Sequence, residues 1–153
     1  MEVKSTLRVV GATGIEEQPG VTKGQTIRRL VGSSEIPTDR VRAAMATYAA
    51  GTIEELHWHP IESFYFVISG HAVVRDIEGN ELEMGPGSFV YAPPGIAGAH
   101  EWEVKEGLEL IAFRATTESN RKFQFTVDKD TMRSYIDLDE LARRDGISFT
   151  SHY

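Results

Sequence analysis

Short apolar stretches, separated by glycine, proline and asparagine, run through the first three quarters of the chain. They are rich in β-branched and aromatic residues, as strands are. The expected strands cover residues 25–32, 40–51, 63–70, 71–79, 88–95 and 108–116. Turns are expected at Gly79-Asn80 and at Gly85-Pro86-Gly87. Many short strands at this spacing are typical of a sandwich or barrel, so the pattern predicts an all-β fold.

No segment of the chain has the composition of a linker or a repeat. The 153 residues are therefore expected to form a single domain, 1–153, with a core of its own. Its strand-rich part predicts a core barrel over about 26–116, preceded by an N-terminal arm, 1–25. The C-terminal extension, 117–153, contains the one clear helix signal, at about 137–145, where an aspartate is suited to the N-cap position.

Composition and charge narrow the classes of function. The chain has 41% hydrophobic and 25% charged residues, which is ordinary for a globular protein. Its net charge of -7 disfavours nucleic acids and anionic membranes as partners, since both require clustered Lys and Arg. No apolar run is long enough to span a membrane and the N-terminus does not resemble a signal peptide, so a cytoplasmic location is expected. Cysteine is absent, so a metal would be held by histidine, carboxylate or amide groups.

Histidine is scarce, and two of the five histidines frame the tripeptide HWH. Residues i and i+2 of a strand share one face, so His57 and His59 can direct their imidazoles to one point. His100, which follows a Pro-Pro-Gly turn, is the candidate for a third ligand from a neighbouring strand. Three imidazoles on one side of a metal leave positions open for substrate and for water or O₂. His71 and His152 are predicted not to be ligands.

Two segments resemble the two motifs of the cupin superfamily. GTIEELHWHPIESFYFVISG resembles the first motif, in which a His-x-His pair and a glutamate lie between two glycines. GSFVYAPPGIAGAH resembles the second, in which Pro-x-Gly precedes a histidine. The positions in register are Gly51, His57, His59 and Gly70 in the first segment and Gly87, Pro93 and Gly95 in the second. The resemblance implies a double-stranded β-helix, the RmlC-like cupin or jelly-roll barrel, with a metal inside it.

Two departures from these motifs affect the metal site. Counting back from Gly70, the metal-binding glutamate of the family would be at position 63, but that residue is Ser63, and Glu62 lies one place earlier. A shift of one residue reverses the face of a strand. Either Glu62 reaches the metal from a loop, or it points away and three histidines alone hold the metal. The second departure is that four residues, rather than two, separate Gly95 from His100. The three-histidine arrangement is favoured, with Glu62 near the metal as a fourth ligand or an acid/base group.

Several residues near the motifs have both a functional and a structural interpretation. Tyr65 is a candidate to hydrogen-bond the substrate, although a core position is favoured for it. Trp58 is expected to point away from the ligands that flank it, and Trp102 to line the pocket mouth or pack in the core. Arg40 and Arg42 precede an expected strand. An arginine in the pocket would bind a substrate carboxylate, but a solvated edge position is favoured for both.

Resemblance to the three-histidine cupins favours an Fe(II) dioxygenase that chelates a small oxygen-bearing substrate. In the alternative, a zinc, manganese or nickel ion acts as a Lewis acid for an isomerase, lyase or cyclase. The candidate catalytic residues, Glu62 and Tyr65, would then move protons. A third interpretation is a module that binds a small molecule without turnover. The expected partners are a small-molecule substrate and, from the resemblance, a second copy of the chain in a homodimer.

Overall fold

The computed structural model describes residues 2–38, 40–115 and 124–136. These residues form β-strands and two short 3₁₀ helices, η1 (Ala12–Gly14) and η2 (Ile96–Gly98). The strands are β1 (Gln18–Pro19), β2 (Gln25–Val31), β3 (Arg42–Tyr48), β4 (Ile53–Trp58), β5 (Ser63–Asp76), β6 (Glu81–Met84), β7 (Phe89–Ala92), β8 (His100–Arg114), β9 (Phe125–Val127) and β10 (Ser134–Tyr135). The predicted all-β class is confirmed. The helix expected at about 137–145 lies outside the described residues.

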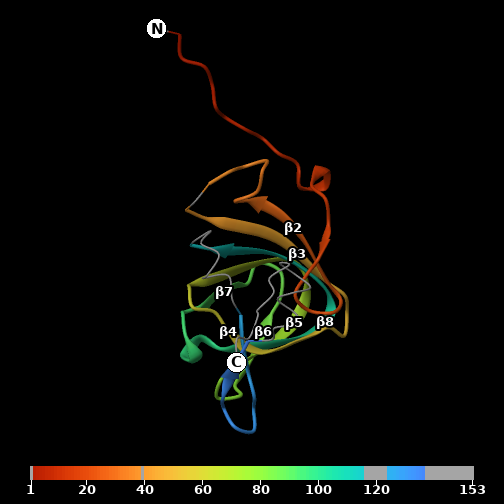
Figure 1. Ribbon diagram of the computed structural model, residues 1–153. Helices are drawn as coiled ribbons and strands as arrows, with labels where there is room; N and C mark the ends of the chain where they lie inside the picture. Colours follow the sequence, from red (N-terminus) through yellow and green to blue (C-terminus); the bar gives the residue numbers. More distant parts are fainter. Residues whose placement is uncertain (1, 39, 116–123, 137–153) are drawn as a thin grey trace, which may run out of the picture.

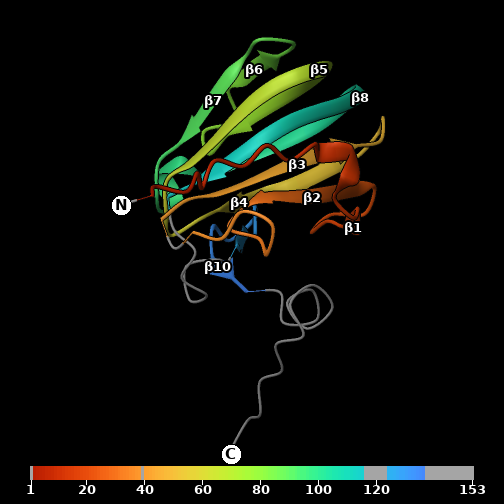
Figure 2. The same ribbon diagram turned by 90° about the horizontal axis from the view of Figure 1, so that it is seen from above.

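The two longest strands, β5 and β8, each take part in two sheets. The second half of β8 pairs with β3 and with the first half of β5, whereas its first residues pair with β4 and the second half of β5. One sheet therefore runs β1-β2-β3-β8-β5-β7 and the other β10-β9-β4-β8-β5-β6, and every pairing is antiparallel. Figures 1 and 2 show these sheets wrapped into the jelly-roll barrel that the sequence predicts.

A glycine lets β5 pass from one sheet to the other without a turn. Residues 63–70 and 71–79 were expected as two strands, and this prediction is wrong, because β5 continues through Gly70 with register shifts on both sides of it. Gly70 has a φ of 85°, and a Cβ atom there would lie 2.0 Å from the carbonyl oxygen of Gly107 on β8. Only glycine therefore fits at this close approach of the two strands.

Apolar side chains from both sheets fill the barrel. The main cluster contains Ala46, Tyr48, Tyr65, Val67, Ala72, Val74, Met84, Ala92, Trp102, Val104, Leu108 and Leu110. Trp102 is 1% exposed and packs edge-on against Tyr48 and Tyr65, so it is a core residue. Trp58 stacks on Phe125 of β9 with ring centroids 4.2 Å apart, in line with the expected packing role. In the described part of the chain, no helix has the length and apolar character needed to cross a membrane.

Candidate metal centre

Strands β4 and β8 bring three histidines to one point. His57 lies on β4, His59 follows the last residue of β4, and His100 begins β8 and pairs directly with His57. The backbone N–H of Gly95 donates to the carbonyl oxygen of His59 over 2.9 Å, which holds the Pro-Pro-Gly turn against the end of β4. All three side chains are buried, and their candidate ligand atoms lie within 4.8 Å of one another. This arrangement could hold one metal ion.

Backbone carbonyl groups fix the orientation of two of the imidazole rings. Nδ1 of His57 donates to the carbonyl oxygen of Glu55 over 2.7 Å, and Nδ1 of His100 donates to that of Gly98 over 2.9 Å. A carbonyl oxygen can only accept, so Nδ1 carries the proton and Nε2 keeps a lone pair for a metal. Nε2 of His57 is buried without a hydrogen-bond partner among the described residues. A buried lone pair of this kind, within a group of three imidazoles, fits a metal ligand.

The four residues between Gly95 and His100 include the 3₁₀ helix η2. This 3₁₀ turn contains Gly98, whose carbonyl oxygen accepts the hydrogen bond from His100. A Cβ atom on Gly98 would lie 1.9 Å from the carbonyl oxygen of Pro93, so the turn packs closely on the Pro-Pro-Gly loop. The departure from the motif spacing therefore leaves His100 opposite His57 and supplies the acceptor that orients its ring.

Burial keeps these imidazoles neutral. It lowers the pKa of His57 to about 4 and the pKa of His100 to about 3, and the proximity of His57 contributes to the second shift. Only a neutral imidazole can bind a metal. The two side chains are therefore in the ligand form at neutral pH.

We expect the metal-free protein to lose stability as the pH falls from about 6.5 toward 5. In this range both histidines bind protons in the unfolded chain but not in the folded one, because their folded pKa values are lowered. The unfolded state takes up more protons, so the free energy of unfolding decreases by at most about 1.4 kcal/mol per pH unit for each histidine. Thermal denaturation of chelator-treated protein at several pH values measures this. The stability of the variant His57→Gln/His100→Gln should depend less steeply on pH. An equally steep dependence would show that these two histidines do not cause the loss of stability.

Glu62 lies outside the histidine group. Its side chain is exposed, and its Oε1 atom accepts a hydrogen bond of 3.0 Å from the hydroxyl of Tyr91. Strand β5 begins at the fully buried Ser63, so the alternation of the strand directs Ser63 inward and Glu62 outward. Of the two alternatives for Glu62, the structure has the one in which it points away. His71 pairs with Glu83 and also lies outside the group, and His152 is not among the described residues.

A different carboxylate, Glu54 of β4, lies beside the histidines. It is buried, and its Oε1 atom is 3.6 Å from Nε2 of His57. The hydroxyl of Tyr48 donates to Oε2 over 3.1 Å, and Nε2 of Gln25 donates to that hydroxyl over 2.6 Å. Burial raises the pKa of Glu54, although the hydrogen bond from Tyr48 acts in the opposite direction. A raised pKa favours proton uptake, so this buried carboxylate is suited to accept a proton and return it.

Tyr65 and Arg114 approach the other two histidines. The Tyr65 hydroxyl lies 3.4 Å from Nε2 of His59 and 3.5 Å from Nε2 of His100. Nη2 of Arg114 lies 3.4 Å from Nε2 of His59. The ring of Tyr65 is buried in the core, as expected, but its hydroxyl reaches the candidate metal centre. A hydroxyl and a guanidinium are therefore present where a substrate would meet the metal.

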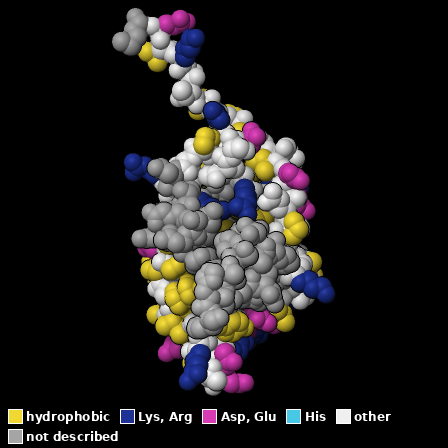
Figure 3. Space-filling view, viewed as in Figure 1, with side chains coloured by type: hydrophobic (Ala, Val, Ile, Leu, Met, Phe, Trp, Pro, Cys, Tyr) yellow, Lys and Arg dark blue, Asp and Glu magenta, His cyan; other side chains and the backbone are white. Residues whose placement is uncertain are grey.

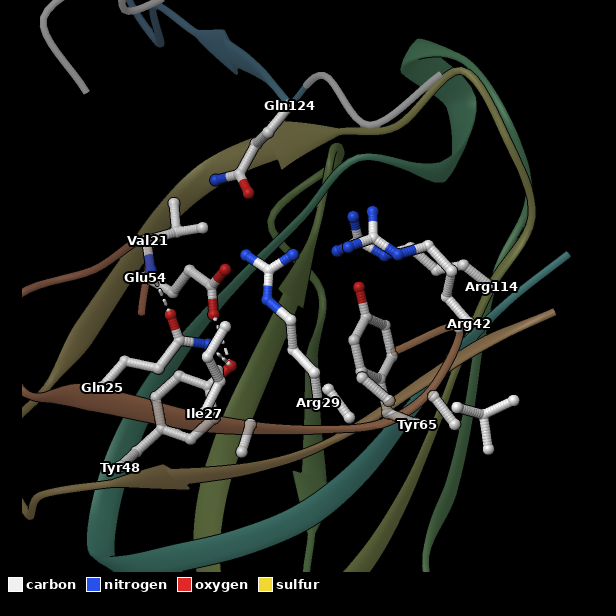
Figure 4. Close-up of a pocket in the computed structure, with 16 residues that line it drawn as sticks. Val21, Gln25, Ile27, Arg29, Arg42, Tyr48, Glu54, Tyr65, Arg114 and Gln124 are labelled. Carbon is white, nitrogen blue, oxygen red and sulfur yellow. Dashed lines mark hydrogen bonds between the residues drawn. The ribbon is translucent and has the colours of Figure 1, made fainter. Parts of the chain in front are cut away.

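A cavity of about 120 Å³ is separated from the histidines by side chains that contact them, and its described lining does not include the histidines themselves. Glu54, Tyr65 and Arg114 line it, and each of them also approaches Nε2 of a histidine. Arg29 of β2 and Arg42 of β3 line it as well, and Figure 4 shows the three guanidinium groups and the Tyr65 hydroxyl directed into the same space. Arg42, for which a solvated edge position was favoured, thus lies in the cavity wall.

Sequence reasoning missed Glu54 and the arginines of β2 and β8. Strict alternation would place Glu54 and His57 on opposite faces, because they are three residues apart. The ladder between β4 and β8 shifts register between them, so both point inward. The sequence shows no sign of this bulge. A signal was available for Arg29, since Ile27 and Val31 lie two positions away on either side and share its face.

Comparisons with known proteins agree on the fold. The family model described as a cupin domain matches residues 44–113. A search of curated proteins finds no match.

Among solved structures, the polyketide cyclase RemF from Streptomyces resistomycificus has 18% identity and a TM-score of 0.63 over 72% of this chain and 80% of its own. An RmlC-like cupin from Shewanella frigidimarina NCIMB 400 has 16% identity and a TM-score of 0.61 over 75% of this chain and 96% of its own. The DMSP lyase DddQ from Ruegeria pomeroyi DSS-3 has 18% identity and a TM-score of 0.59 over 70% of this chain and 59% of its own. At these identities the likeness to solved structures is one of fold alone.

Proposed function

The chain is a member of the cupin superfamily, and on that premise we propose that it is a metal-dependent enzyme that transfers a proton on a small organic substrate. The reaction class is that of an isomerase, lyase or cyclase. The observation that carries the proposal is the position of Glu54 and Tyr65. Both side chains are buried, both line the cavity, and both lie within 3.6 Å of an imidazole Nε2 atom.

His57, His59 and His100 would hold the metal, and zinc, manganese, nickel and iron all accept imidazole ligands. When bound, the ion supplies a Lewis acid that polarises an oxygen atom of the substrate. The other roles fall to the side chains around it. Tyr65 donates a hydrogen bond to the same oxygen, which stabilises the negative charge that develops there.

Glu54 is the proposed acid/base group. Its Oε1 atom faces the histidines and the cavity, and its Oε2 atom is held by Tyr48. One oxygen is therefore oriented by the protein while the other is directed toward the substrate, as a positioned base requires. Two of the structural neighbours, a cyclase and a lyase by name, are compatible with this class of reaction.

An Fe(II) dioxygenase, favoured by the sequence, is the second candidate. The feature that supports it is the ligand set, because the metal-binding group among the described residues contains histidines and no carboxylate. This leaves several coordination positions for a chelating substrate and O₂. Glu62, which was expected near the metal, is directed to the surface and has no part in either proposal.

Deuterium exchange and O₂ uptake distinguish the two candidates. We expect metal-loaded protein, incubated without O₂ in D₂O with small oxo- and hydroxy-acids, to incorporate deuterium at a carbon of the accepted compound. Nuclear magnetic resonance measures this exchange, since a base that removes a proton from carbon can return a deuteron. An oxygen electrode provides the second reading. O₂ uptake that matches product formation would favour the dioxygenase, and tight binding without either reaction would favour a binding module.

A further inference from the structure

The cavity of about 120 Å³ has a floor of small residues between larger polar ones. Strand pairing places Arg29 of β2 opposite Ala44 of β3, Ala44 opposite Ala112 of β8, and Ala112 opposite Tyr65 of β5. All four residues line the cavity. The two alanines leave open space above the sheet, and Arg29 and Tyr65 border this space on opposite sides.

Two more arginines lie in the next row of the same sheet. Arg42 and Arg114 are direct cross-strand partners on β3 and β8, and both line the cavity. Like charges opposite each other destabilise a sheet. Arg29 lies on the strand next to Arg42, two positions from it in register, and therefore on the same face. Three guanidinium groups thus converge on one small space, as Figure 4 shows.

Two of these arginines, Arg29 and Arg114, have no carboxylate partner in the described part of the chain. Nε of Arg29 is buried and has no hydrogen-bond partner in the part of the chain that the structure describes. Buried donors and charges without partners cost free energy. A cavity with this cost is explained if an anion occupies it during function.

The described lining of the cavity is cationic. It contains three arginines and one carboxylate, Glu54, so its cationic side chains outnumber its anionic one. The chain as a whole carries -7, so this cationic cavity is a local exception. Figure 3 shows Lys or Arg side chains near the centre of the molecular face that is turned toward the viewer. A lining of this kind favours an anionic ligand.

We propose that this cavity binds a small dicarboxylic acid as the substrate of the histidine site. One carboxylate binds Arg29 and Arg42, and the other lies beside Arg114, whose guanidinium contacts His59. The planar fork of a guanidinium matches a carboxylate with two parallel hydrogen bonds. This inference names the substrate class of the site described above, and so rests on the proposed function.

A phosphate ester carries the same charge but fits the lining less well. Phosphate sites in proteins usually present successive backbone N–H groups at a helix N-terminus or in a glycine-rich loop. The described residues that line this cavity come mainly from β2, β3, β4, β5 and β8, and none of them is a serine, threonine or lysine. Arginine binds carboxylates and phosphates alike, so a phosphate ester is disfavoured only by the absence of these residues and of a helix N-terminus from the described lining.

Isothermal titration calorimetry on the purified full-length chain tests the proposal. The probes are the dicarboxylates from oxalate to glutarate, the neutral succinamide, and inorganic phosphate, at constant ionic strength. We expect at least one dicarboxylate to bind at least tenfold more tightly than succinamide and phosphate. Arg29→Met should weaken that binding at least tenfold, the loss typical of a charge-assisted pair. It should not lower the melting temperature of the ligand-free protein, because it removes an unbalanced charge.

Arg28→Met is the matched control. Arg28 is the neighbour of Arg29 on β2, but it pairs with Glu17 and does not line the cavity. Its substitution should change the dissociation constant less than twofold. Equal binding of dicarboxylates and succinamide would overturn the proposal, as would unchanged binding by the Arg29 variant. If phosphate binds more tightly than every dicarboxylate, the proposed dicarboxylic acid is wrong and a phosphate ester is the better ligand class.

The same titrations on His57→Ala/His59→Ala separate this inference from the proposed function. The arginines do not belong to the histidine group, so binding that depends on Arg29 should persist in the variant with a reduced affinity. If the unaltered chain holds no metal but binds a dicarboxylate through Arg29, the enzyme proposal fails and the ligand class remains. If it holds metal and binds none of the probes, the ligand class fails and the enzyme proposal remains.

Discussion

The double variant His57→Ala/His59→Ala should lose nearly all of its bound metal under conditions in which the unaltered chain holds close to one divalent ion. Two of the three buried imidazoles of the candidate centre are then absent, and His100 alone cannot hold an ion tightly. Elemental mass spectrometry on untagged, dialysed protein measures the metal content. The metal should also raise the melting temperature of the unaltered chain but not that of the variant, because a ligand of the folded state stabilises it.

His71→Ala is the matched control for this experiment. His71 pairs with Glu83 near the surface, so its removal should leave the metal content unchanged. Circular dichroism shows whether the double variant folds, since both substituted side chains are buried. If it does not fold, His57→Gln/His59→Gln keeps more of the side-chain volume and tests the same ligands. A folded variant that retains a full complement of metal would remove the histidine group as the site.

Glu54→Gln should lower the turnover rate of the metal-loaded enzyme by about 10²–10⁴-fold, which is the contribution of a positioned acid or base. Glutamine keeps the shape of the side chain and can accept the hydrogen bond from Tyr48, but it cannot take up a proton. The metal content should remain that of the unaltered chain. Solvent deuterium exchange into the accepted substrate and elemental mass spectrometry on the same sample provide both readings.

Glu55→Gln is the control for Glu54→Gln. The two residues are adjacent on β4, but Glu55 is exposed, and it is its backbone carbonyl group that contacts His57. Its substitution should leave the turnover rate unchanged. A loss of metal together with activity in the Glu54 variant would instead make Glu54 a metal ligand. Unchanged activity would exclude it as the acid/base group.

The histidine group was largely accessible from the sequence because local rules determine most of it. A strand places residues i and i+2 on one face, which is enough to pair His57 with His59. His100 is a candidate because it follows the Pro-Pro-Gly turn, but its pairing with His57 is a long-range contact that only the structure shows. The outward direction of Glu62 also follows from alternation, once the first residue of β5 is known to be Ser63. Sequence alone left that boundary open.

The strand-rich pattern also determined the all-β class and the turn at Gly79, but it divided β5 into two strands at Gly70. Glycine is compatible with a turn and with a bend in a continuous strand. The choice between them depends on β8, whose backbone at Gly107 comes so close that a Cβ atom on residue 70 would lie 2.0 Å from the Gly107 carbonyl oxygen. Information of this kind lies in the partner strand.

The sequence by itself therefore determined the fold class, the turn at Gly79 and the histidines that could bind a metal. Only the tertiary structure decided which polar residues surround them. Glu54 joins His57 through a bulge that reverses the expected face, and Arg29, Arg42 and Arg114 meet because β2, β3 and β8 are neighbours in this register. The alternation of a strand determines which residues share a face. It does not determine which face is covered or which strand lies alongside, because those depend on pairing between residues that are distant in the chain.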